Sequence, residues 1–199
     1  MVSQARTEHW EIVGDSSRLT FSLRHIVVSE ILGLFRTWGG EMLFDPDDMS
    51  RARIRIWVDL ASIDTGSAEC DDHVRSKEFL HVAQFPRAEF TSTQVVPRQD
   101  GAAALTGWLQ LHGIARYVAL TVVAERAWVD DDGHLRAAYR VHGEIDRQAF
   151  GLHWNQDLDF GGIVVGDRVE IQAHVELVRT ADASFARRDP TGEISAGSR

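Results

Sequence analysis

Residues 105–124, reading LTGWLQLHGIARYVALTVVA, constrain the fold of this chain more than any other stretch. In the first half, residues 105–112, apolar or small side chains alternate with side chains of mixed polarity. In the second half, from residue 118 to residue 124, every second side chain is again apolar or small. The link between the halves, residues 112–115, contains Gly113. Period-two alternation on both sides of such a link predicts a long antiparallel hairpin. A lone hairpin is marginally stable in water, so the rest of the chain must cover its apolar face.

The same alternation recurs along most of the chain. It predicts strands at residues 9–13, 18–25, 33–45, 53–59, 87–96, 102–112, 116–129, 135–145 and 165–178. The pair Gly39-Gly40 inside one of them is typical of a bulge or bend that lets a sheet curl. Long strands in simple succession favour an all-β fold, either an up-and-down barrel or a strongly curled sheet. An eight-stranded barrel either fills itself with side chains or holds one small ligand.

One helix interrupts the strands, at about residues 68–80. Ser67 can cap its start, acidic residues crowd its first turn, and Arg75 and Lys77 come late, as the helix dipole favours. The length of the chain suggests a single domain. We therefore divide it into a loose lead-in at residues 1–8, a barrel domain at residues 9–179 and a disordered tail at residues 180–199.

Charge and cysteine content exclude several classes of function. The chain carries 21 basic and 30 acidic residues, a formal net charge of −9, which argues against nucleic-acid binding and against docking on anionic membranes. Its one cysteine, Cys70, allows neither an internal disulfide nor a cysteine-based metal site. The first residues lack a secretory pattern, and no apolar run is long enough to span a bilayer. We expect a cytoplasmic protein without stable membrane insertion.

Motifs for catalysis or metal binding are missing from the sequence. Nine histidines occur without an HxxxH or HExxH spacing, although ligands from separate strands would leave no linear signature. Ser62, Asp64 and Thr65 lie in a turn, and no G-x-S-x-G motif accompanies them. We therefore predict no catalytic residue, no metal site and no cofactor.

Two polar residues have competing interpretations. His25 shares the phase of Leu23, so it would either contact a ligand head group or be a structural histidine bonded to the backbone. Arg147 would either bind an anionic head group through its planar fork of donors, or lock its loop through a salt bridge to Asp146 or Asp157. For His112, beside Gly113, a role in the turn is favoured.

Several stretches, taken in order, resemble one known family. They are FSLRHIVVSEILGLFRTWGG, SIDTG followed by DDHVRSKEFL, QFPRAEFTST, LTGWLQLHG, and DRQAFGL with VVGDRVEIQAHVEL. Each is weak alone, but their order and spacing resemble the YceI-like family, lipocalin-like barrels associated with binding polyisoprenoids and other long-chain lipids. The resemblance covers residues 9–179 and implies an extended antiparallel eight-stranded barrel with an elongated apolar interior. It implies no catalytic residues. Many members carry a secretory signal, which we do not expect here, and the link at residues 114–116 departs from the family's usual polar or proline-containing turn.

Apolar stripes and the two polar candidates make up the predicted ligand site. It comprises Phe21, Leu23, His25, Phe35, Ile56, Phe90, Leu109, Leu111, Leu120, Arg147 and Phe150. Alternation alone does not separate a hollow barrel from a filled one, and only the resemblance favours a tunnel. The resulting hypothesis is non-covalent binding, transport or storage of a long isoprenoid or fatty-acyl chain. The alternatives are an enzyme or redox protein with haem, quinone or another cofactor, and an oligomeric scaffold with a solid barrel. Outward Trp57 and Trp108 would be covered by the helix or by a second subunit, as in a homodimer.

Overall fold

A computed structural model describes residues 8–25, 29–45, 48–154 and 165–180 of the chain. Its strands are β1 (Glu8–Ile12), β2 (Arg18–His25), β3 (Ser29–Phe35), β4 (Trp38–Asp45), β5 (Asp48–Asp59), β6 (Ile63–Asp64), β7 (Arg87–Pro97), β8 (Ala102–Leu111), β9 (Ile114–Val129), β10 (Leu135–Asp146) and β11 (Val165–Thr180). The helical segments are α1 (Ala68–Arg75) and the 3-10 turns η1 (Gly14–Ser16), η2 (Leu60–Ser62) and η3 (Arg147–Phe150). None of these helices is both long enough and apolar enough to cross a membrane.

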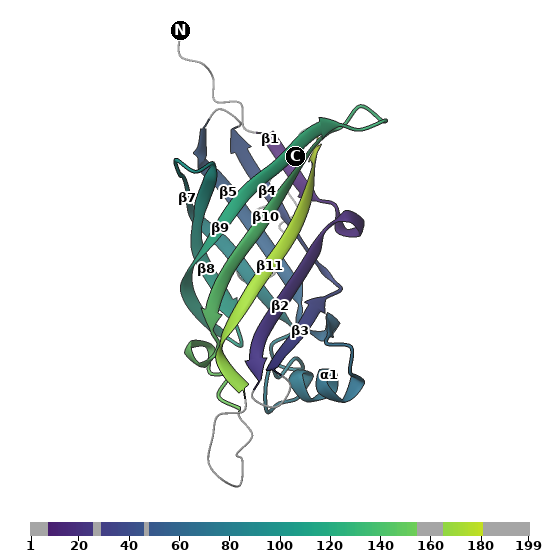
Figure 1. The fold of residues 1–199 in the computed structure, drawn as a ribbon, viewed down its shortest axis with the longest axis vertical. Helices are drawn as coiled ribbons and strands as arrows, with labels where there is room; N and C mark the ends of the chain where they lie inside the picture. Colours follow the sequence, from purple (N-terminus) through teal and green to yellow (C-terminus); the bar gives the residue numbers. More distant parts are fainter. Residues whose placement is uncertain (1–7, 26–28, 46–47, 155–164, 181–199) are drawn as a thin grey trace, which may run out of the picture.

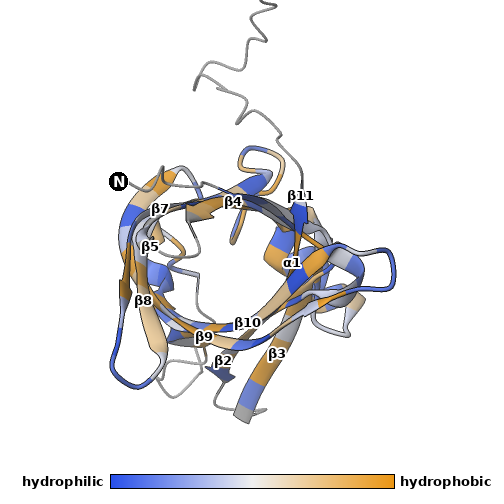
Figure 2. Ribbon diagram, turned by 90° about the horizontal axis from the view of Figure 1, so that it is seen from above, coloured by the Kyte–Doolittle hydropathy of each residue, from blue (hydrophilic) through white to orange (hydrophobic). Residues whose placement is uncertain are grey.

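The strands close into a barrel (Figure 1). Neighbours follow the order β1-β4-β5-β7-β8-β9-β10-β11-β2-β3-β6, and β1 also pairs with β11. Since β1 and β2 pair with successive parts of β11, they are two halves of one strand interrupted by η1. β3 and β4 are likewise two halves of one strand, and β6 spans only two residues. The result is a closed antiparallel barrel of eight long strands, which confirms the predicted fold class. Figure 2, seen from above, shows these strands as a ring.

Two clusters of buried side chains lie at opposite ends of the barrel. At the end formed by the β7–β8 and β9–β10 turns, hereafter the hairpin end, the cluster includes Trp10, Phe90, Leu105, Val175 and Leu177. At the other end, where α1 and η3 lie, hereafter the helix end, it includes Leu60, Leu80, Leu111, Ile145 and Phe150. Inward positions of each strand supply both clusters, as the alternation predicts.

The strand predicted at residues 33–45 is wrong in its boundaries. β3 begins earlier, at Ser29, and a bend at residues 36–37 separates it from β4. At this bend the Arg36 amide donates to the Ser62 carbonyl (3.1 Å) and the Thr37 amide donates to Ser62 Oγ (3.0 Å). These bonds divert the backbone toward η2. β5 also begins earlier than predicted, at Asp48.

The hairpin at residues 105–124 has a tighter turn than the predicted four-residue link. β8 ends at Leu111 and β9 begins at Ile114, so His112 and Gly113 form the turn, with φ of 52° and 73°. Two successive positive φ values match the twist of the strands on either side. His112 Nδ1 lies 3.1 Å from the Phe150 carbonyl oxygen, and its ring meets Phe85 edge-on. The turn role predicted for His112 is confirmed.

The helix is also shorter than predicted. Ser67 Oγ accepts from the Cys70 amide at the start, as expected, but α1 ends at Arg75 and residues 76–85 form successive turns. Ser76 leaves the helical region with ψ of 168°, and its hydroxyl accepts from the Glu78 amide (3.2 Å). A serine that bonds to nearby backbone in this way competes with helix continuation.

Candidate functional site: an apolar cavity in the barrel

A cavity of about 790 Å³ lies inside the barrel. Its wall includes Trp10 and Leu177 from the hairpin end and Leu60 and Leu152 from the helix end, so it extends between the two clusters. Pockets for small molecules in proteins typically enclose about 300–1,000 Å³. The barrel is therefore hollow, which alternation in the sequence did not decide.

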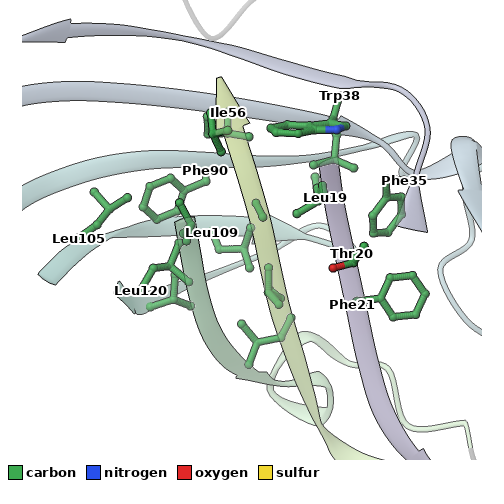
Figure 3. Close-up of a pocket in the computed structure, with 18 of the residues that line it drawn as sticks. Leu19, Thr20, Phe21, Phe35, Trp38, Ile56, Phe90, Leu105, Leu109 and Leu120 are labelled. Atoms are coloured by element: carbon green, nitrogen blue, oxygen red, sulfur yellow. The ribbon is translucent and has the colours of Figure 1, made fainter. Parts of the chain in front are cut away.

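The cavity wall is almost entirely aliphatic and aromatic. Among the residues that the structure describes, the polar side chains of the wall, apart from tryptophans, are Glu8, Thr20, Thr65, Cys70, His73, Tyr139 and Arg147. Figure 3 shows apolar side chains from several strands, including Ile56, Phe90 and Leu120, gathered around one space. Such a surface suits a water-poor, apolar occupant.

Two glycines let aromatic rings lie against the wall. Phe90 pairs with Leu109 across β7 and β8, and its ring covers Gly107, where an added Cβ would come within 2.7 Å of Phe90 Cζ. Phe21 covers Gly33 in the same way, with 2.3 Å to Phe21 Cζ. A side chain at Gly33 would displace the Phe21 ring. A side chain at Gly107 would also meet the Thr91 carbonyl oxygen (2.3 Å), so the backbone would have to shift as well.

Most of the predicted ligand residues line this cavity. They are Phe21, Leu23, Phe35, Ile56, Phe90, Leu109, Leu111, Leu120 and Arg147. Phe150 is instead packed in the helix-end cluster with 1% of its surface exposed, and it is not among the described residues of the cavity wall. His25 ends β2, and its side chain lies outside the part of the chain that the structure describes.

Arg147 is held by a complete set of hydrogen bonds. Nε donates to the Gly166 carbonyl (2.9 Å), and Nη1 donates to the carbonyls of Leu152 (2.6 Å) and Trp154 (2.8 Å). Nη2 donates to the Val165 carbonyl (3.1 Å) and to Asp167 Oδ1 (3.3 Å). A guanidinium has five N–H donors, and here each has a protein partner. The side chain is 1% exposed, so it fastens residues 152–154 to residues 165–167.

The acidic partner of Arg147 among the described residues is not the predicted Asp146. It is Asp167, whereas Asp146 accepts from the Gln148 amide (2.9 Å) and caps η3. Asp157, the other predicted partner, lies outside the described residues. Burial lowers the pKa of the Arg147 guanidinium, and the Asp167 carboxylate opposes that shift. An anionic ligand at Arg147 would have to displace existing bonds.

At the helix end, a second set of polar contacts fixes α1. Asp71, 8% exposed, accepts from both the amide and the hydroxyl of Thr65 (each 2.8 Å). Arg75 donates from Nε to the Ala61 carbonyl (2.9 Å) and from Nη2 to the Ile63 carbonyl (2.7 Å). These bonds attach the helix to η2 and β6, while its Cys70, His73 and Val74 side chains line the cavity. The helix thus completes the wall where β5 has ended.

Sequence reasoning missed several wall residues, among them Trp38, His73 and Tyr139. Tyr139 had a usable signal, since it shares the alternating phase of Val141 on a predicted strand. His73 lies on the helix, where a period-two pattern gives no indication. Its ring meets the Trp154 ring edge-on at 4.2 Å between centroids.

A group of metal-ligating residue types lies away from the cavity, at the β9–β10 turn. Asp130, Asp132 and His134 have candidate ligand atoms within 4.8 Å of one another. Asp130 is already engaged: it accepts from Arg136 Nε (2.6 Å) and from the amides of Asp132 and His134. The hydrogen bond from Arg136 lowers the pKa of the Asp130 carboxyl, followed by the bond from the His134 amide. These contacts account for the arrangement as a turn.

Comparison with known proteins agrees with the fold and the motifs. The model of the YceI-like domain matches residues 10–177. The chain belongs to the YceI-like family. Protein YceI of Salmonella newport (strain SL254) is 34% identical over 139 residues, which cover 70% of this chain and 72% of that relative. The family resemblance seen in the sequence is therefore confirmed.

Two solved structures are similar to the YceI-like barrel described above. BcnA of Burkholderia cenocepacia superposes with a TM-score of 0.72 at 22% identity, covering 83% of this chain and 98% of that one. A polyisoprenoid binding domain from Saccharophagus degradans gives a TM-score of 0.62 at 13% identity, covering 86% and 98%. At these identities the likeness establishes the shared fold.

Proposed function

We propose that this protein binds a long apolar molecule, of isoprenoid or fatty-acyl type, non-covalently inside the barrel for transport or storage. The observation that carries the proposal is the 790 Å³ cavity with its aliphatic and aromatic wall. The name of the Saccharophagus domain, which binds polyisoprenoid, supports the same ligand class.

Burial of the chain supplies the binding free energy. Each methylene moved from water into the cavity contributes about 0.8 kcal/mol, against which the ligand loses translational and conformational freedom. A long chain gains more from burial than a short one. We therefore expect affinity to rise with chain length until the cavity is full.

Direct detection is the first test. Native mass spectrometry of purified protein, before and after organic extraction, should reveal a removable apolar ligand. Polyprenyl and acyl probes should then bind to the extracted protein. If no lipid co-purifies and no probe binds, the proposal is wrong, and a visible absorption band or stoichiometric metal would instead support a cofactor protein.

Filling the cavity is the second test. Leu120 lines the cavity beside Leu105 on β8 and covers Gly143, so Leu120→Trp adds volume inside the barrel. We expect binding of long chains to weaken roughly 5- to 150-fold, the equivalent of the 1–3 kcal/mol that overpacking an interior typically costs. Leu32→Trp is the matched control, because Leu32 is 64% exposed on β3 and is not among the described residues of the cavity wall. Thermal melts would confirm that both variants fold. Equal binding by the two variants would contradict an interior site.

A further inference from the structure

Two unpartnered polar atoms on the cavity wall are covered by other side chains. Among the described residues, Trp10 Nε1 and His73 Nε2 have no hydrogen-bond partner, but both atoms are completely covered. A ligand would reach either atom only after the surrounding side chains moved. Neither is therefore a ready contact.

Tyr139 differs from these two residues. No hydrogen bond joins its hydroxyl to any described residue, yet Oη is not among the covered, unpartnered atoms, so it keeps accessible surface. Tyr139 lines the cavity, as do Ala137 and Val141 on the same face of β10. An accessible phenol hydroxyl in an apolar cavity is a hydrogen-bonding group without a protein partner, and such groups usually find one when buried.

The local structure aims this side chain inward. Tyr139 pairs with Val175 on β11 and with Ala124 on β9, and a shift of register between Ala138 and Tyr139 marks a bulge in the β9–β10 pairing. Bulges commonly re-aim side chains beside functional sites. Burial raises the pKa of the Tyr139 phenol, so the hydroxyl stays protonated and can both donate and accept.

Charge on the wall limits what Tyr139 could hold. Arg147 is the only lysine or arginine among the described residues of the wall, and its donors are all occupied. Glu8 adds an acidic group, paired with Arg179 (2.9 Å), at the hairpin end. An anionic head group would be buried here without a counter-charge, which is costly. A neutral oxygen avoids that cost.

We infer that the Tyr139 hydroxyl anchors a neutral hydroxyl or carbonyl oxygen carried by the apolar ligand. This inference rests on the proposed function and adds the class of head group. From Tyr139 to Asp146 at the helix end, β10 extends roughly 23 Å at about 3.3 Å per residue. The ligand chain runs in that direction, toward Ile145 and Arg147 on the cavity wall at the helix end.

Removal of one oxygen atom tests the inference. Tyr139→Phe should weaken binding of the isoprenoid alcohol geranylgeraniol roughly three- to ten-fold, the usual worth of a neutral hydrogen bond. Binding of the matching hydrocarbon, which lacks the hydroxyl, should not change. Tyr117→Phe is the matched control, because Tyr117 is 54% exposed outside the barrel and should leave both affinities unchanged.

A second measurement keeps Tyr139 in place, so its result does not depend on whether the Tyr139→Phe variant folds. In Tyr117→Phe protein, Tyr139 is the one remaining tyrosine, since the chain has two. Adding the alcohol should perturb its absorption band more than adding the hydrocarbon, which binds in the same cavity but has no oxygen. Equal changes with both probes would contradict the anchor.

The outcomes separate the two proposals. If Tyr139→Phe leaves binding of the alcohol unchanged while all proteins bind both probes, the anchor is wrong and the proposed function stands. If geranylgeranyl diphosphate binds more tightly than the alcohol, the neutral head group is wrong. If no apolar probe binds to the unmodified protein, both proposals fail.

Discussion

The two ends of the barrel are held together by different forces. At the hairpin end the wall consists of continuous strand ladders, and apolar packing around Trp10 and Leu177 dominates. At the helix end β5 has stopped, and α1, η2 and η3 replace it as wall. There the non-strand segments are fastened by the buried donors of Arg147 and by the contacts of Asp71. Where backbone pairing ends, buried side chains must satisfy the freed carbonyls, and one arginine satisfies four of them.

Loss of Arg147 should have the largest effect on stability. Arg147→Ala removes one donor from each of four carbonyls and from the Asp167 carboxylate, which keeps its bond from Gln148 Nε2 (2.7 Å), so we expect a loss of about 3–5 kcal/mol in the free energy of unfolding. Urea denaturation would measure it. Arg147→Lys should recover little, because an ammonium has three donors on a flexible stem rather than a planar fork.

A surface arginine provides the control for this prediction. Arg168, with its side chain 78% exposed, pairs with Glu144 on the outer face of the barrel. Arg168→Ala should cost less than about 1 kcal/mol. A similar cost for both arginines would show that the helix end does not depend on its buried donors.

At the hairpin end the corresponding change removes apolar contacts. Leu177 is completely buried, and Leu177→Ala should cost about 2–4 kcal/mol, in the lower part of the range for such truncations. The new space adjoins an existing cavity, so no isolated void forms. Leu32→Ala on the exposed face should change stability by less than about 0.5 kcal/mol. If Leu177→Ala lost more free energy of unfolding than Arg147→Ala, the contrast between the two ends would be reversed.

The smallest expected effect concerns the two tyrosines, which compare the inside of the barrel with its outside. Hydrogen bonds from Thr106 and Thr93 lower the pKa of Tyr117, whereas burial raises that of Tyr139. In an alkaline titration followed by phenolate absorbance, Tyr117 should ionise first. Tyr117→Phe should remove the earlier step and Tyr139→Phe the later one. The opposite assignment would mean that the interior is more polar than its wall residues indicate.

The two pKa shifts should make the free energy of unfolding depend on pH in opposite directions. The Tyr139 contribution is complete below the unfolded pKa of about 10 and is lost as the pH rises through the higher folded value. The Tyr117 contribution is complete above the unfolded pKa and is lost as the pH falls through the lower folded value. Denaturation of each Phe variant between pH 8 and pH 11 would separate the two.

Four expectations from the sequence stay predictions. These are the cytoplasmic location, the homodimer, the head-group role of His25, and the ligand-binding roles of the wall residues. Trp108 is 52% exposed on β8, while the Arg87 guanidinium lies 5.2 Å from the Trp57 ring on β5.

The boundaries of α1 and β3 were the weakest structural predictions. Side-chain bonds of Ser76 and Ser62 lie where α1 and β3 end, and the periodicity of the sequence does not indicate such bonds.

Alternation by itself determined the all-β class and the faces of each strand, and the order and spacing of the local motifs indicated the family. This is possible because strand geometry is local: successive side chains point to opposite faces whatever they meet. Only the tertiary structure decided that the interior is hollow, because the same inward pattern serves a filled barrel. It also decided that the Arg147 guanidinium donates to backbone carbonyls and that the Tyr139 hydroxyl has no hydrogen bond to a described residue. Both results depend on which groups from distant segments come within hydrogen-bonding distance. The alternating pattern at residues 105–124, which predicts a hairpin, does not indicate those partners.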